Sequence, residues 1–329
     1  MQFGVEMDSN TCARLVGDIG GTNARFAWKT GASTPLTDIA TYACADHPTL
    51  QHAMQHYLAE HGKPAPPWCA IGIANPVVGD QVQMTNHHWS FSISAIKSAL
   101  GFERFLVLND FTALALSLPT MPASDLRQVG GGTAVQDAPL GLIGPGTGLG
   151  VSGLLPARKG RGAIPINGEG GHVTLAATDA LEEAVVRLLK RQFGHASAER
   201  ALSGPGLVNL YGVLCEIDGV PAKTLVAADI TTLALSGQDP QCSTAVDVFF
   251  SLLGTVAGNL ALSLGARGGL YIGGGIVPRL GDRIASSNFR QRFDDKGRFR
   301  AYLSPIPVFV VHASTSPALM GAAQALEES

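Results

Sequence analysis

The chain has 329 residues, with 46% hydrophobic and 15% charged residues and a formal net charge of −3. This composition is typical of a globular protein and excludes a disordered one. The charge balance offers no basic surface for nucleic acid, and neither a basic run nor a long apolar stretch indicates a membrane protein. Because Glu6 and Asp8 precede any apolar run, we expect no signal peptide but a cytoplasmic protein that acts on small molecules.

The cysteines are few, odd in number and scattered, and none forms a Cys-x-x-Cys pair. This pattern argues against a disulfide framework and against a structural zinc site, and it suits a reducing compartment. The five are Cys12, Cys44, Cys69, Cys215 and Cys242.

The first part of the chain alternates predicted strands with predicted helices. Alternating apolar runs bounded by glycine, proline or polar residues predict the strands, and helical spacing of apolar residues predicts the helices. We expect strands at 14–19, 25–29, 40–44, 68–74, 81–89 and 105–108, and helices at 48–61, 93–100 and 112–118. Ser92 is the expected cap of the second helix, and Pro119 ends the third.

The second part repeats this pattern after a crossing at 121–138, which is rich in Gly, Ala and Asp. We expect strands at 140–143, 150–155, 269–272 and 308–311, and helices beginning at Thr178 or Asp179 and at 197–202, 207–215, 245–264 and 317–327. One glycine-turn hairpin in each half indicates an α/β protein with a weak internal duplication. We expect a small lobe of residues 1–120 plus about 308–329, and a larger lobe of residues 121–307.

A glycine-rich turn joins the first two predicted strands. Its successive backbone N–H groups and its threonine hydroxyl can hold phosphate oxygens, and Asp18 can face a phosphate-bound Mg²⁺ through water. An ordinary hairpin turn that needs glycine is an equally good interpretation of this segment alone. The turn reads Gly17-Asp18-Ile19-Gly20-Gly21-Thr22-Asn23.

Two further glycine clusters follow predicted strands in the second half. The first repeats the chemistry of the early turn, which suggests a phosphate chain held by two turns. Neither turn fits the Gly-Lys-Ser/Thr of a P-loop or the spacing of a Rossmann turn, so those enzyme classes are disfavoured. The last cluster would let a flat ring lie on the backbone, although a strand-to-helix turn would also explain it. The two clusters contain Gly146, Thr147 and Gly148, and Gly273, Gly274 and Gly275.

Five polar residues are candidates for binding a substrate. Asn109 and Asp110 end an apolar strand, where α/β folds place ligand sites, and Asp110 could act as a general base. The alternative for Asp110 is an N-cap of the following helix, which by itself is the better interpretation. Glu169 and His172 on a glycine loop could bind hydroxyl groups, as could Glu199. A surface loop and a solvated helix position are the corresponding alternatives.

Together these segments resemble the bacterial glucokinase family, the group without the zinc-binding cysteine cluster of the repressor/open-reading-frame/kinase (ROK) sugar kinases. The resemblance runs in order from about Leu15 to Leu319. Small departures are Pro145, where a smaller residue is common, and an N-terminus longer by several residues. The matching segments are residues 17–25, 108–113, 146–150, 168–172, 197–206 and 273–279.

The resemblance implies a fold and a reaction. The fold is the two-lobed α/β fold of hexokinase and actin (ribonuclease H-like), with an active-site cleft between a small and a larger lobe. It further implies ATP, Mg²⁺, commonly a homodimer, and phosphorylation of D-glucose to glucose 6-phosphate. The implied sugar contacts are Asn109, Asp110, Glu169, His172 and Glu199, with Asp110 as the general base that takes the proton of the terminal hydroxyl.

Other functions remain open at this point. A kinase for another hexose is the nearest enzyme alternative. A sugar-sensing regulator would need a helix-turn-helix segment, for which the dozen residues before the first strand are too few. A nucleotide-driven chaperone or filament protein of the same fold would lack the sugar carboxylates.

Overall fold

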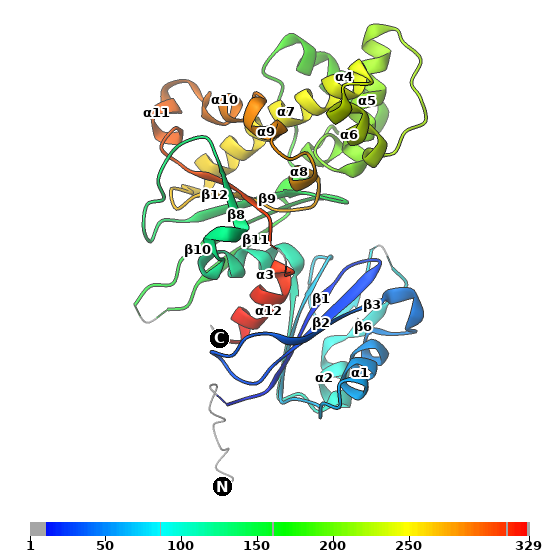
Figure 1. Ribbon diagram of the computed structural model, residues 1–329, viewed down its shortest axis with the longest axis vertical. Helices are drawn as coiled ribbons and strands as arrows, with labels where there is room; N and C mark the ends of the chain where they lie inside the picture. The colour runs from blue at the N-terminus through cyan, green and yellow to red at the C-terminus, as the bar shows by residue number, and fades with distance from the viewer. Residues whose placement is uncertain (1–10, 86, 160, 314, 328–329) are drawn as a thin grey trace. The chain divides into compact units, whose positions relative to one another are not determined.

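The computed structural model describes residues 11–85, 87–159, 161–313 and 315–327, and the chain divides into two compact units (Figure 1). The first unit contains Met1–Met121, Ala157–Pro165 and Ala313–Ser329, and the second contains Pro122–Pro156 and Ile166–His312. Each unit has its own sheet and its own hydrophobic core.

The sheet of the first unit has the strand order β3-β2-β1-β4-β7. Strand β1 pairs antiparallel with β2 and parallel with β4, and β4 pairs parallel with β7. The carboxyl ends of β1, β4 and β7 therefore meet at one edge of the sheet, where α/β folds place ligands. The strands are β1 (Arg14–Ile19), β2 (Asn23–Lys29), β3 (Thr37–Ala43), β4 (Trp68–Ile73) and β7 (Arg104–Asn109).

Helices cover both faces of this sheet, because successive side chains of its central strands point to opposite sides. On β1, Leu15 and Ile19 pack into the core with α1 and α2, whereas Val16 packs against α12. Figure 1 shows α12, the last helix of the chain, beside α3 and the sheet. The helices are α1 (Leu50–Glu60), α2 (Ile93–Leu100), α3 (Asp110–Ser117) and α12 (Pro317–Glu327).

A short hairpin in the first unit differs from the expected long strand at 81–89. The segment forms β5 (Gln81–Gln83), which pairs antiparallel with β6 (Ser90–Ser92). The N–H of Met84 donates to the carbonyl of Trp89 at 3.0 Å and closes the turn. The expected cap of the next helix is confirmed, since the Ser92 side chain accepts a hydrogen bond from the N–H of Ala95.

The sheet of the second unit has the order β11-β10-β9-β12-β13-β8. Strand β9 pairs antiparallel with β10 and parallel with β12, and β12 pairs parallel with β13. These pairings repeat those of the first sheet and confirm the internal duplication. The strands are β8 (Leu126–Val129), β9 (Leu140–Pro145), β10 (Leu149–Leu155), β11 (Ile164–Gly168), β12 (Leu270–Ile272) and β13 (Val308–Val311).

The two units differ from the expected lobes in two places, at 157–165 and at 308–312, and the expected crossing contains a strand. Strand β13 lies in the second sheet, because its apolar residues pair with β12 on one side and with β8 on the other. Strand β8 lies inside the segment 121–138 that we expected to be a crossing. Residues 157–165 belong to the first unit. Of the two elements after residue 307, α12 belongs to the first unit and β13 to the second. We retain the division into a small and a larger lobe as a prediction.

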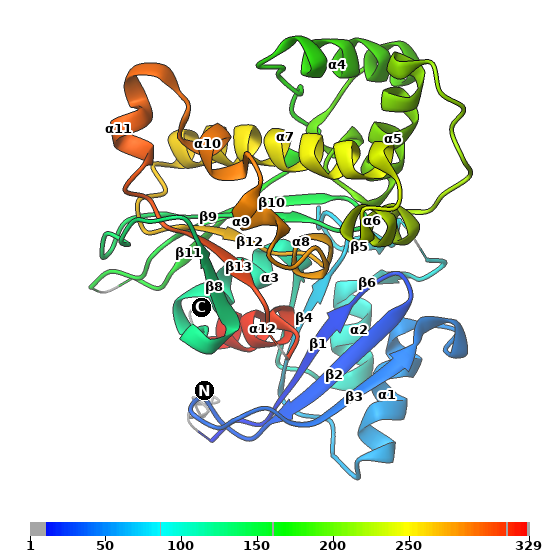
Figure 2. The ribbon, with the colours of Figure 1, turned by 45° about the horizontal axis from the view of Figure 1, so that its top comes forward.

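Helix α7 (Pro240–Leu264) forms the centre of the second unit's core, with α5, α6 and α10 packed against it (Figure 2). Among the described residues it is the one helix long and apolar enough to cross a membrane, with a mean hydropathy of 1.6. However, 78% of that apolar window is buried, so the sequence is explained by packing inside the unit. The other helices are α4 (Ala180–Phe193), α5 (Gly204–Asp218), α6 (Ala227–Ser236), α8 (Ile276–Arg279), α9 (Arg283–Ser286), α10 (Phe289–Asp294) and α11 (Arg300–Leu303).

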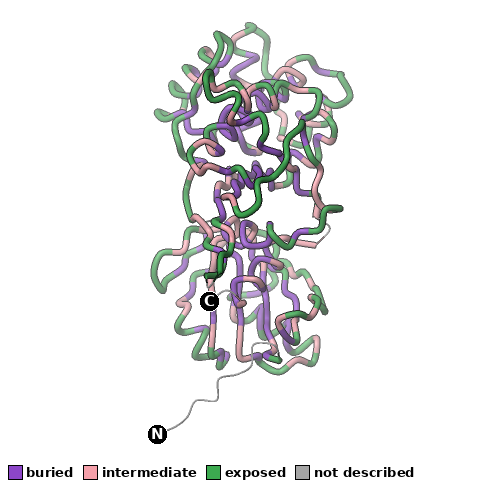
Figure 3. Tube along the Cα trace, turned by 90° about the vertical axis from the view of Figure 1, so that its left-hand side faces the viewer, coloured by how far each residue is buried: buried purple, intermediate pink, exposed green. Residues whose placement is uncertain are grey.

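Figure 3 shows buried segments inside each unit and exposed segments along its outer loops. The start of α4 is confirmed at Asp179, whose side chain accepts from the N–H of Glu182. The expected helix at 197–202 is only one turn of 3-10 helix, Ala198–Arg200.

Candidate functional site

The turn between β1 and β2 is held from outside by the short 3-10 helix Cys44–Asp46. Within the turn, the N–H of Gly20 donates to the carbonyl of Asn23 at 2.9 Å. The N–H of Cys44 donates to the carbonyl of Thr22 at 2.8 Å, and its thiol donates to the carbonyl of Gly20 at 3.4 Å. Burial raises the pKa of this thiol, so it stays a neutral donor. The carbonyls of Thr22 and Gly20 thus each accept a hydrogen bond from Cys44.

Asp18 precedes this turn, and two other side chains contact one of its carboxylate oxygens. Oδ2 accepts from Oγ of Ser316 at 2.6 Å and from Nη1 of Arg25 at 3.2 Å. Among the described residues no group of three or more His, Cys, Asp or Glu side chains could hold a metal ion unaided. One carboxylate beside a glycine turn fits a Mg²⁺ ion that would arrive with nucleotide phosphates and keep its waters.

Asn109 and Asp110 lie at the junction of β7 and α3, and the structure assigns the helix cap to Asn109. Its Oδ1 accepts from the N–H groups of Phe111 at 3.0 Å and Thr112 at 3.3 Å. Asp110 is the first helical residue, and its Oδ1 accepts from the N–H of Phe111 at 2.9 Å. Capping is therefore explained by Asn109, and the alternative interpretation of Asp110 loses its main support.

In the second unit, the turn between β9 and β10 contacts Glu199. The N–H of Leu149 donates to Oε2 of Glu199 at 2.9 Å, and a Cβ atom added at Gly148 would lie 2.6 Å from the same oxygen. Across the turn, the N–H of Gly146 donates to the carbonyl of Gly148 at 2.8 Å. Glycine at 148 thus makes room for the Glu199 carboxylate.

Glu169 and His172 belong to a glycine loop that packs on the start of β10. A Cβ atom added at Gly171 would lie 2.1 Å from the carbonyl oxygen of Leu149, so only glycine fits there. The N–H of Ala198 donates to the carbonyl of Val173 at 2.9 Å, which ties this loop to the segment that carries Glu199. The second unit therefore brings Glu169, His172 and Glu199 to the same turn, with the first two exposed.

The third glycine cluster packs directly behind the second turn. Gly274 has φ +76°, and a Cβ atom there would lie 2.2 Å from the carbonyl oxygen of Pro145. Gly273 donates its N–H to the carbonyl of Ile143 at 2.9 Å. Beyond this cluster lies an open cavity of about 680 Å³, lined by Leu235, Arg279, Leu280, Gly281, Asp282, Arg283, Ala285 and Ser286.

The candidate residues fall into two groups that match the two units. The first unit holds the carboxylates of Asp18 and Asp110, and the second holds Glu169, His172 and Glu199 beside the later glycine turns. Sequence reasoning missed the Ser316 contact to Asp18 and the arginine-lined cavity, because neither follows a local pattern.

Comparison with known proteins places this arrangement in a family. The glucokinase family profile matches residues 15–329. A glucokinase of Aromatoleum aromaticum is 53% identical over 322 residues, which cover 98% of this chain and 96% of that protein. The chain belongs to the glucokinase family. It is accordingly a glucose kinase that uses ATP, as the resemblance of its motifs implied.

Solved structures agree with this membership. A glucokinase from an Antarctic psychrotroph has a TM-score of 0.88 and 37% identity, and the match covers 96% of this chain and 99% of that one. A ROK family glucokinase from Streptomyces griseus, in complex with glucose and AMPPNP, has a TM-score of 0.63 at 18% identity and shares the fold. That match covers 96% of this chain and 100% of the other. The predicted two-lobed, hexokinase-like α/β fold is confirmed.

Proposed function

We propose that Asp110 is the general base that takes the proton of the glucose 6-hydroxyl while the γ-phosphoryl group of ATP is transferred to that oxygen. The observation that carries this proposal is that Asn109, and not Asp110, is the N-cap of α3. Asn109 caps the helix through two N–H groups, so the carboxylate of Asp110 is not needed for capping. It sits at the carboxyl end of β7, where the sheet edge offers a ligand site.

Five polar side chains would orient the sugar: Asn109, Asp110, Glu169, His172 and Glu199. The contact between Glu199 and the N–H of Leu149 supports this role, because it fixes the carboxylate before substrate arrives. Fixed carboxylate and amide groups around an all-equatorial sugar would penalise a misplaced hydroxyl, since an unpaired buried polar group costs about 1–3 kcal/mol.

The two hairpin turns would hold the phosphates of ATP through backbone N–H groups and the hydroxyls of Thr22 and Thr147. Mg²⁺ bound with the nucleotide would neutralise phosphate charge, with Asp18 facing it through water. The adenosine end would lie at Gly273, Gly274 and Gly275 and in the cavity beyond them. The cavity supports this assignment because Arg279 lines it and lies 4.0 Å from a Cβ atom added at Gly275.

We also propose that the protein works in the cytoplasm and as a homodimer, with neither nucleic acid nor a membrane as partner. The buried thiols and the net charge of −3 support a soluble enzyme in a reducing compartment. The dimer rests on the family alone.

An ATP-dependent phosphorylation assay across a panel of hexoses tests the proposed specificity. We expect turnover of glucose in the presence of Mg²⁺, with mannose and fructose at least about tenfold poorer in kcat/KM, which corresponds to about 1.4 kcal/mol. Equal turnover of fructose or mannose would contradict the proposed specificity. Omitting Mg²⁺, with a chelator present, should abolish turnover of every sugar.

A further inference from the structure

Asp18 is contacted by the residue that precedes the C-terminal helix. The hydroxyl of Ser316 lies 2.6 Å from Oδ2 of Asp18, although the two residues are 298 positions apart in the sequence. This is the length of a short, charge-assisted O–H···O hydrogen bond. The other contact of that oxygen, with Nη1 of Arg25 at 3.2 Å, comes from a side chain that is 45% exposed.

Contacts at the start, middle and end of α12 fix the position of Ser316, which immediately precedes this helix. Pro317 begins the helix with a fixed φ, and the carbonyl of Ser316 accepts from the N–H of Leu319 at 3.1 Å. In the middle of the helix, a Cβ atom at Gly321 would lie only 1.5 Å from the carbonyl oxygen of Ala113. The helix therefore lies in close contact with α3, whose first residue is Asp110.

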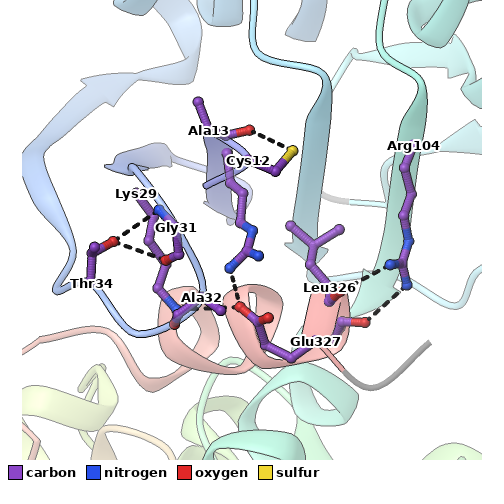
Figure 4. Close-up of polar contacts among 11 residues, drawn as sticks. Cys12, Ala13, Lys29, Gly31, Ala32, Thr34, Arg104, Leu326 and Glu327 are labelled. Carbon is purple, nitrogen blue, oxygen red and sulfur yellow. Dashed lines mark hydrogen bonds and ion pairs between the residues drawn. The ribbon is translucent and has the colours of Figure 1, made fainter. Parts of the chain in front are cut away.

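The far end of α12 is anchored by three basic side chains at the opposite edge of the sheet (Figure 4). Arg14, which is fully buried, pairs with Glu327, and Lys29 lies 3.4 Å from the same carboxylate. Arg104 donates to the carbonyls of Leu326 at 2.9 Å and Ala325 at 3.4 Å, which satisfies the last carbonyls of the helix. A helix fixed at its end and its middle gives Ser316 a defined position.

We propose that Ser316 is a positioning residue for Asp18: its hydroxyl holds the carboxylate in the orientation that faces Mg²⁺ bound with ATP. The inference rests on the proposed role of Asp18. A neutral hydroxyl fixes the carboxylate without cancelling its negative charge, which Arg25 alone would partly do. Residues that orient a metal-facing group through a hydrogen bond change metal affinity or activity by about 10–100-fold when they are removed.

A serine before a helix can also serve only as its cap, and glycine separates the two roles. A cap uses the serine oxygen as an acceptor, and glycine replaces a capping serine at a cost of only a few tenths of a kcal/mol, whereas alanine costs more. Glycine at 316 therefore removes the hydroxyl while preserving most of the capping. Threonine at 316 keeps both functions.

The experiment is calorimetric titration of the free protein with ATP, in Mg²⁺ and in a chelator, alongside thermal unfolding. We expect S316A and S316G to weaken binding of Mg·ATP by about tenfold. Binding of metal-free ATP should stay at the wild-type level in both, and S316T should restore Mg·ATP binding. Ser92 provides the matched control, because it caps α2 and donates to Oδ2 of Asp80 at 2.5 Å. S92A should lower the melting temperature without changing either affinity.

The variant D18N separates failure of this inference from failure of the proposed metal role. If D18N leaves Mg·ATP binding unchanged, the role of Asp18 is wrong and the role of Ser316 falls with it. If D18N weakens binding but S316A and S316G do not, only the positioning role is wrong. In the D18N background the effect of S316A should vanish, and an undiminished effect there would also overturn the proposal.

Discussion

The two hairpin turns share a topology but obtain their carboxylates in different ways. In the first unit the carboxylate belongs to Asp18, which lies on β1 one residue before the strand ends. Strand β9 of the second unit contains no carboxylate, and its turn instead receives Glu199 from a segment some fifty residues later. Two hairpins with the same strand pairing thus differ in the source of the acid, which is local in the first unit and distant in the second.

The turns also differ in the space around their glycines. A Cβ atom at Gly20 would lie 3.5 Å from the carbonyl oxygen of Asn23, which is an ordinary contact. At Gly148 the same atom would meet the Glu199 carboxylate at 2.6 Å. No protein neighbour requires glycine at position 20, whereas the Glu199 carboxylate leaves no room for a side chain at position 148.

The largest expected effect is that of D110N, which removes the proposed base from the first unit and leaves the second unit unchanged. We expect kcat to fall by about 10²–10⁴-fold, because Asn cannot accept the proton. The free energy of unfolding should fall by less than about 1 kcal/mol, since Asn109 still caps α3 and Asn keeps a side-chain oxygen at position 110. Turnover assays and thermal unfolding measure the two effects.

A matched control for D110N is D80N. Asp80 accepts from the N–H of Ser94 at the start of α2 in the same unit, so it tests loss of an acid near a helix N-terminus away from the site. Its kcat should equal that of the wild type. Near-wild-type kcat in a folded D110N protein would leave the base unassigned.

The second unit is tested by G148A. The added methyl group must displace the Glu199 carboxylate, which is the end of a flexible side chain, so the fold should tolerate the change. We expect KM for glucose to rise by about tenfold, because losing a hydrogen bond to a charged group costs about 1.5 kcal/mol or more. Steady-state kinetics with varied glucose measures this shift. The variant G131A is the control, since nothing lies within 4 Å of a Cβ atom there, and an equal KM in both variants would contradict the role of Glu199.

The smallest expected effect concerns the pH dependence of the first unit. His47 is buried next to the helix that holds the first turn, and burial, followed by His56 and His52, lowers its pKa below the usual value, against an opposing effect of Asp46. The unfolded chain therefore binds the proton more readily. The contribution of His47 to the free energy of unfolding is fully present above about pH 6.5, the pKa of the unfolded chain. It is lost as the pH falls toward the lower pKa of the folded state.

Tryptophan fluorescence isolates this effect, because all three tryptophans, Trp28, Trp68 and Trp89, belong to the first unit. We expect the melting temperature of the wild type to fall between pH 7.5 and pH 5.5, and H47Q to lose less over the same interval. H195Q, a change of an exposed histidine in the second unit, should behave like the wild type. An unchanged pH dependence in H47Q would show that another group causes the loss.

Local patterns predicted most elements, because strands and helices with one buried face carry a periodic signal. The cap of α2 at Ser92 and the start of α4 at Asp179 followed from such signals. The pattern did not resolve the turn that splits residues 81–89 into a hairpin. It also did not reveal β8, whose few residues form a strand only because β13 lies beside them.

The candidate site shows the same limit. The glycine motifs and the acids stand in recognisable order along the chain, so the family could be identified from them. What they touch could not be predicted, since the partners of Asp18 and Leu149 come from distant segments. Asn and Asp are both good helix caps, so the sequence alone could not show that Asn109 rather than Asp110 caps α3. That depends on where the helical backbone begins.

The position of α12 has a consequence for biosynthesis. Leu319, Ala322, Ala323 and Leu326 complete the core on one face of the first sheet, yet the ribosome makes them after all of the second unit. The second unit can therefore fold while the chain is still growing, whereas the first must wait with an uncovered apolar face. Until α12 has been made, this apolar face stays uncovered, which favours aggregation of the nascent chain.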